Sequence, residues 1–113
     1  MGNGRSEQRA KNCEVLGLLQ EHGDALTSVR EIDHWAYFRT AEDRSRFVEA
    51  CAAAGFTLRN TSEPAISKLR YGARIFHADI PGESVLDDAT AQISALAVEA
   101  EAEYDGWETQ LVE

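Results

Sequence analysis

Patterns for disulfides, zinc sites and membrane spans are scarce in this sequence. Only two cysteines occur, Cys13 and Cys51, and neither lies in a CxxC or Cys/His spacing, so we expect two free thiols. No apolar run approaches the roughly 20 residues that a membrane-spanning helix needs, and the polar first residues contain no signal-peptide core. We therefore expect a soluble, cytoplasmic protein that does not contact membranes.

Basic residues are also few. The chain has 11 lysines and arginines against 20 aspartates and glutamates, which gives a formal net charge of −9. This charge repels a phosphate backbone, so it argues against direct nucleic-acid binding and favours a basic partner. Net charge of this size also serves solubility alone, and composition does not decide between these two interpretations.

Sequence patterns of catalytic sites are absent. The chain has no GxGxxG, Walker loop, HExxH or serine-elbow motif. The three histidines, His22, His34 and His77, share no metal-ligand spacing, although His34 and His77 can meet across neighbouring strands, where a structural role is favoured. We therefore expect a protein that is not an enzyme and that holds no cofactor or metal.

Helical and strand patterns alternate in the first half of the chain. Leucines and valines at helical spacing predict a first helix that stops at Gly23. Residues 29–39 are rich in β-forming residues and predict a strand. Thr40 with Asp43 then predicts the start of a second helix, which ends at Gly55. The spacing of this helix directs four side chains inward: Phe47, Val48, Cys51 and Ala52.

The second half of the chain predicts a hairpin, a helix and a last strand. Phe56 begins a short strand, residues 60–64 have turn chemistry, and a longer strand runs from residue 66 to about residue 80. Ser84 with Asp87 predicts the cap of a third helix, in which apolar residues recur at three- and four-residue steps. An Asp-Gly pair at 105–106 predicts the turn into a final strand over residues 107–112.

The order of these elements indicates the fold class. After the leading helix the order is β-α-β-β-α-β, which is the ferredoxin-like arrangement of an α+β protein. In that arrangement a four-stranded antiparallel sheet carries both helices on one face and leaves the other face open. The length suits one domain, so we expect a flexible N-terminus at residues 1–12 and a single ferredoxin-like domain at residues 13–113.

The open sheet face is the first candidate binding surface. Alternation along the longer strand places Arg74 and Phe76 on this face. Trp35 and Tyr37 join them if the first strand keeps its aliphatic residues inward, and otherwise they belong to the core. Aromatic and arginine side chains suit both a protein interface and single-stranded RNA, so an RNA- or small-ligand-binding module is the alternative. The RNP1 pattern of RNA-binding modules is missing, and the net charge is unfavourable for RNA. An open face with exposed aromatic side chains would also suit a homo-oligomer.

Four features together resemble the ribonuclease E inhibitor family of type B, the RraB regulators. They are Ile32-Asp33-His34-Trp35, Gly55-Phe56, the Ala- and Leu-rich third helix and Glu103-Tyr104-Asp105-Gly106-Trp107. The resemblance implies a ferredoxin-like fold and a regulatory domain that binds the arginine-rich scaffold region of ribonuclease E. It further implies that binding lowers RNA cleavage without any catalysis by the regulator. An acidic chain matches such a scaffold by charge complementarity.

The candidate site residues form two groups. The first group comprises the motif positions, which serve structure or binding: Asp33, His34, Trp35, Tyr104, Asp105, Gly106 and Trp107. For the last four we favour a structural role, because a corner between helix and strand requires turn residues flanked by large side chains. The second group comprises candidate partner contacts: Tyr37, Arg74, Phe76, Glu99 and Glu103.

Overall fold

The computed structural model describes residues 3–63 and 71–113, and it confirms the predicted order of elements. None of the helices in these two ranges combines the length and the apolar composition that a membrane span requires. The elements, in chain order, are α1 (Asn3–Glu21), β1 (Arg30–Phe38), α2 (Ala41–Ala53), β2 (Thr57–Ser62), β3 (Tyr71–Asp79), α3 (Glu83–Glu99) and β4 (Glu103–Thr109).

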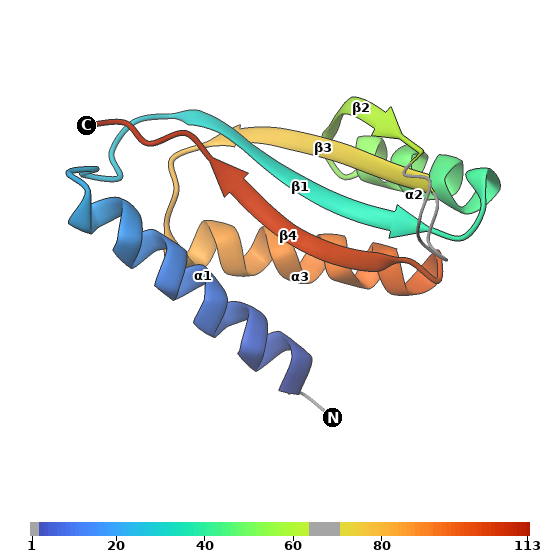
Figure 1. Cartoon of the computed structure of the whole chain (residues 1–113), viewed down its shortest axis with the longest axis horizontal. Helices are drawn as coiled ribbons and strands as arrows, with labels where there is room; N and C mark the ends of the chain where they lie inside the picture. The colour runs from blue at the N-terminus through green and yellow to red at the C-terminus, as the bar shows by residue number, and fades with distance from the viewer. Residues whose placement is uncertain (1–2, 64–70) are drawn as a thin grey trace.

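The four strands form one antiparallel sheet with the order β2-β3-β1-β4. Strands β1 and β3 lie at the centre, and β2 and β4 form the edges. Figure 1 shows the helices on one side of this sheet, with α3 running beneath β4 and β1, and α2 at the end beside β2. The predicted α+β fold with helices on one face is therefore confirmed.

The core lies between the inner sheet face and the helices α2 and α3. Alternate residues of β1 point inward, so Ile32, Ala36 and Phe38 are buried. Phe47 and Cys51 of α2 are buried against them, as predicted, whereas Ala52 is exposed and its predicted inward position was wrong. Ala52 follows Cys51 by one residue and therefore lies about 100° further round the helix, on the solvent side.

The helix ends agree with the sequence at α2 and differ at α3. The Thr40 hydroxyl accepts a hydrogen bond from the Asp43 amide at 3.1 Å, and Gly55 follows the helix with φ of +100°, as predicted. In α3 the N-cap is Gly82, which makes no side-chain cap hydrogen bond, so the predicted cap at Ser84 was wrong. The carboxylate of Asp87 is instead bound by side chains of α1.

The first helix begins earlier than predicted. It starts at Asn3, within the segment that we expected to form a flexible N-terminus. Its polar residues Arg9 and Asn12 hydrogen-bond Asp87 of α3, so tertiary contacts stabilise a stretch that has little apolar patterning of its own.

The hairpin turn also differs from the prediction. Strand β2 extends through Ser62, and Asn60 pairs with Arg74 of β3, so residues 60–62 are strand and not turn. A register irregularity at Arg59 lets these polar residues pair. The predicted start of the longer strand, at residue 66, lies outside the described residues.

Candidate functional site

The two motif segments are neighbours in the sheet. Strand β1 carries residues 33–35 and strand β4 carries residues 104–107, and the two strands pair antiparallel. Facing pairs across these strands are His34 with Trp107, Trp35 with Gly106, and Ala36 with Tyr104. Motifs that lie about seventy residues apart in sequence therefore form one structural unit, with some side chains on the inner face and others on the open face.

The Asp105-Gly106 pair forms a β-bulge and not the predicted turn. The register between β1 and β4 shifts between Trp35 and Ala36, which leaves Asp105 as the extra residue of β4. Gly106 has φ of +125°, a conformation that side-chain-bearing residues rarely adopt. The corner between α3 and β4 lies earlier, at Glu101 with φ of +54°. An Asp-Gly pair suits turns and bulges alike, so the sequence alone did not distinguish them.

On the inner face a chain of hydrogen bonds links Tyr104, His34, His77 and Asp79. The Tyr104 hydroxyl lies 2.8 Å from His34 Nδ1, and His34 Nε2 lies 2.9 Å from His77 Nε2. His77 Nδ1 lies 2.7 Å from Asp79 Oδ2. One set of tautomers satisfies all three contacts, with Tyr104 donating to His34, His34 to His77 and His77 to Asp79.

Burial controls the protonation of this chain. Burial of His34, with His77 beside it, lowers the pKa of the imidazole to about 3, although Asp33 acts in the opposite direction. Burial likewise raises the pKa of the Tyr104 phenol. The predicted meeting of His34 and His77 is therefore observed, and it fits a structural role. Within residues 3–63 and 71–113 no group of three or more His, Cys, Asp or Glu side chains is placed to hold a metal ion.

Trp107 connects the motif to α1 through Asn12, which sequence analysis missed. The indole Nε1 donates to Asn12 Oδ1 at 2.7 Å, and Asn12 Nδ2 donates to Asp87 Oδ1 at 3.0 Å and to Thr90 Oγ1 at 3.1 Å. Asn12 is fully buried. The sequence contained one indication that Asn12 faces inward: it precedes Leu16, which is buried, by four residues and thus shares its helix face.

On the open face Asp33 holds two arginines. Its carboxylate accepts hydrogen bonds from Arg59 Nε at 3.1 Å and from Arg74 Nε at 2.8 Å, and Arg59 also binds Glu31. The Asp33 side chain is only 9% exposed, so two guanidinium groups largely cover it. Both arginines are therefore paired with carboxylates of the same face.

Aromatic rings lie beneath these arginines. The Arg59 guanidinium lies 4.2 Å from the ring centre of Phe76, and that of Arg74 lies 4.6 Å from the ring of Trp35. Both distances are in the range of cation–π contacts. Tyr37 covers Gly72, where an added Cβ would lie 3.0 Å from the tyrosine ring. The predicted sheet-face residues are thus brought together, and their rings are partly exposed.

The remaining two predicted contacts lie on different surfaces. Glu103 is exposed and faces Tyr37 across the strand pair, at the β4 edge of the open sheet face. Glu99 is exposed at the end of α3 and lines a groove between α2 and α3 together with Arg46. The structure therefore separates Glu99 from the other four candidate contacts.

Comparison with known proteins gives a consistent result over nearly the whole chain. The family model described as "Regulator of ribonuclease activity B" matches residues 9–109, from α1 through β4. A relative from Pseudoalteromonas translucida (strain TAC 125), which carries the same description, is 35% identical over 105 residues. That alignment covers 88% of this chain and 92% of the relative.

Proposed function

Because the chain belongs to the family of regulators of ribonuclease activity B, we propose that it binds ribonuclease E and lowers RNA cleavage without catalysis of its own. The observation that carries this proposal is the family match, which extends across residues 9–109 and includes both paired motifs. The partner of such a regulator is a ribonuclease, and the protein acts by occupying a surface of that enzyme.

Charge supports the basic scaffold region of ribonuclease E as the partner surface. The chain carries a formal charge of −9, and complementary charge mainly raises the association rate and the specificity of a complex. The sheet-face residues Tyr37, Arg74, Phe76 and Glu103 stay predicted contacts, as does Glu99 on the helix side. Charge reversals at Glu99 and Glu103 compare these two surfaces directly.

Direct RNA binding on the open sheet face is less well supported. Arg59 and Arg74 both bind the carboxylate of Asp33, so neither presents a free cation to a phosphate group. Phosphate contacts supply most of the affinity in non-specific nucleic-acid binding.

Calorimetric titration distinguishes the two proposals. We expect the scaffold fragment of ribonuclease E from the same organism to bind at physiological salt, and a single-stranded RNA oligomer not to bind. Binding of the RNA together with no binding of the fragment would contradict the proposed function.

A further inference from the structure

A groove lies between α1 and β4, the helix that is added to the ferredoxin-like order and the strand that carries the second motif. Figure 1 shows the N-terminal half of α1 running away from β4. The groove has a volume of 320 Å³, and all four motif residues from Tyr104 to Trp107 line it. The opposite wall is formed by α1, chiefly through Lys11, Glu14, Val15 and Leu18.

The floor of the groove is apolar and is not covered by the rest of the described chain. Tyr104 and Trp107 point to the helix side of the sheet, where their polar atoms bind His34 and Asn12, and both side chains are partly exposed in the groove. Leu18 is 49% exposed at the opposite wall. Solvent-exposed apolar side chains gathered in one concave site are typical of a docking surface.

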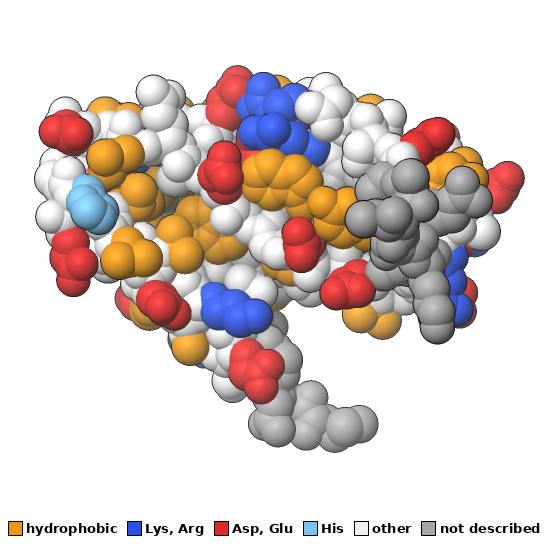
Figure 2. Space-filling model, in the orientation of Figure 1, with side chains coloured by type: hydrophobic (Ala, Val, Ile, Leu, Met, Phe, Trp, Pro, Cys, Tyr) orange, Lys and Arg blue, Asp and Glu red, His pale blue; other side chains and the backbone are white. Residues whose placement is uncertain are grey.

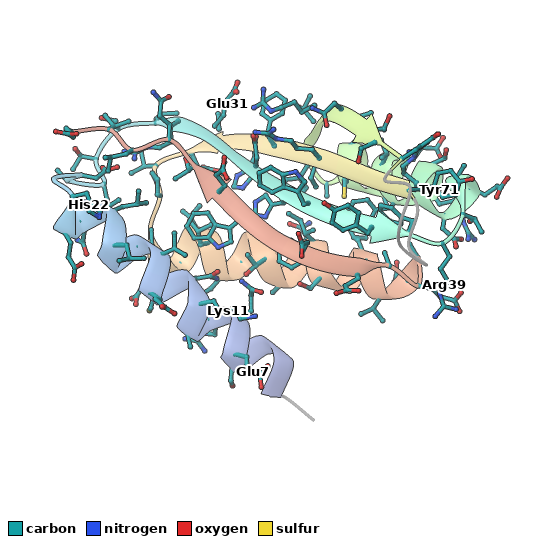
Figure 3. All side chains as sticks on the ribbon, in the orientation of Figure 1. Glu7, Lys11, His22, Glu31, Arg39 and Tyr71 are labelled. Atoms are coloured by element: carbon teal, nitrogen blue, oxygen red, sulfur yellow. The ribbon has the colours of Figure 1, made fainter. Side chains whose placement is uncertain are left out.

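The charges around this floor are mainly negative. Glu14 and Asp105 are exposed carboxylates on opposite walls, and Lys11 is the basic residue that lines the groove. Glu7 lies on the same helix, about one turn before Lys11 (Figure 3). Figure 2 shows Asp and Glu side chains on both sides of the space between β4 and α1. The net charge of −9 adds to this local excess, so a cationic ligand is favoured.

We propose that this groove docks a cationic peptide segment that carries one apolar side chain. The apolar side chain enters between Leu18 and Trp107, and its basic neighbours face Glu14 and Asp105. That the segment belongs to a ribonuclease rests on the proposed function, whereas its chemistry rests on the walls of the groove.

The two other candidate surfaces, the open sheet face and the groove between α2 and α3, fit a cationic segment less well. On the open sheet face the aromatic rings of Trp35 and Phe76 are partly covered by the guanidinium groups of Arg74 and Arg59, so less apolar surface is free there. The groove between α2 and α3 is lined by Arg46 as well as by Glu99, so its lining has no excess of negative charge. Of these three surfaces, the α1–β4 groove therefore combines free apolar surface with negative charge best.

The two tryptophans report on different surfaces, which makes the inference testable by fluorescence. Trp35→Phe leaves Trp107 in the groove as reporter, and Trp107→Phe leaves Trp35 on the open sheet face. The probe is a short arginine-rich peptide with one central leucine, compared with the same peptide that has glycine in that place. We expect the leucine peptide to shift the emission of the Trp35→Phe variant and to bind about tenfold more tightly than the glycine peptide. A response of the Trp35 reporter alone, or of neither reporter, would overturn the proposal.

Substitutions at exposed groove residues give a second test with matched controls. We expect Leu18→Ser and Glu14→Lys each to weaken binding of the leucine peptide about fivefold or more. The controls are Val98→Ser, at an apolar residue of α3 that is 75% exposed, and Glu49→Lys on the exposed side of α2. Circular dichroism checks that all four variants are folded. Equal weakening by the controls, or none by the groove variants, would count against the groove.

The scaffold fragment of ribonuclease E separates this inference from the proposed function. If the peptide binds in the groove and the fragment does not bind at all, the groove proposal stands and the proposed partner is wrong. If the fragment binds Leu18→Ser and Glu14→Lys as tightly as the wild type, the groove proposal fails and the proposed function stands. Self-association that Leu18→Ser abolishes would show that a second copy fills the groove, which also overturns the proposal.

Discussion

Asn12 connects three elements through one buried amide. It accepts from Trp107 of β4 and donates to Asp87 and Thr90 of α3, so it determines where α1 lies against the rest of the molecule. A buried polar side chain of this kind is stable only with all its partners in place.

Replacement of Asn12 should therefore destabilise the fold strongly. We expect Asn12→Ala to lower the free energy of unfolding by about 2 kcal/mol, because the indole N–H loses its acceptor and the Asp87 carboxylate loses one of its two donors. Urea unfolding measures this change, and Gln20→Ala, at an exposed residue of the same helix, is the control. Equal stability of Asn12→Ala and the wild type would contradict the role that we assign to this amide.

His34 makes stability depend on pH. Its pKa is about 3 in the folded protein and 6.5 as the ordinary value, so the unfolded chain binds more protons between these limits. Stability is thus greatest above pH 6.5 and is lost as the pH falls toward 3, with a loss of about 2 kcal/mol at pH 5 from this group. Urea unfolding at pH 7 and pH 5 checks this, with His34→Gln expected to show the smaller pH effect. Equal pH effects in both proteins would show that His34 does not control the pH dependence of stability.

Side-chain faces were predictable from the sequence, and hydrogen-bond partners were not. Alternation along β3 places Ile75 inward and Arg74 outward, as the structure shows; for β1 the sequence left two choices, and the structure has Ala36 inward and Trp35 outward. The binding of Asp33 to two arginines depends on strand register, which periodicity does not specify.

At the scale of elements, the bulge in β4 depends on one glycine. We expect Gly106→Ala to cost about 1 to 2 kcal/mol, because φ of +125° is strained for alanine although no atom blocks the new Cβ. Gly17→Ala in α1 is the matched control, since its Cβ also meets open space. That substitution should stabilise the helix by about 0.5 to 1 kcal/mol. Thermal unfolding measures both, and changes of the same sign would contradict this account.

A second local arrangement holds the segment after β4. Asp24, in the loop after α1, accepts hydrogen bonds from the Val112 amide at 3.0 Å and from the Leu26 amide at 2.8 Å. It also binds Arg30, which hydrogen-bonds the Gln110 carbonyl at 3.1 Å. We expect Asp24→Ala to accelerate hydrogen exchange at the Val112 amide while amides of β3 keep their protection. Unchanged exchange at Val112 would show that this loop does not hold the segment.

Element boundaries were predictable where a local signal decides them. The start of α2 follows from Thr40 and the end from Gly55, because each acts within one helical turn. The start of α1 and the extent of β2 depend on contacts with distant residues, so the sequence pattern placed both incorrectly.

At the scale of the molecule, charge predicts how binding responds to salt. If the net charge of −9 contributes to partner binding, affinity for the scaffold fragment should fall as ionic strength rises, because salt screens charges over roughly 10 Å at 0.1 M. Titrations at low and high salt measure the effect. An affinity that does not change with salt would remove the electrostatic part of the proposal.

The overall architecture was predictable because each element has its own periodicity and the connections are short. The position of α1 was not, since it depends on Asn12 and on the partners of Asp87. The groove between α1 and β4 depends on that position, so the motifs taken separately did not predict it.

The central claim is that this protein restrains RNA cleavage by binding ribonuclease E at its scaffold region. The most direct measurement compares RNA cleavage by complete ribonuclease E and by the enzyme without that region, each with and without the regulator. We predict slower cleavage by the complete enzyme and no effect on the truncated one. Equal inhibition of both enzymes, or no inhibition of the complete enzyme, would contradict the claim.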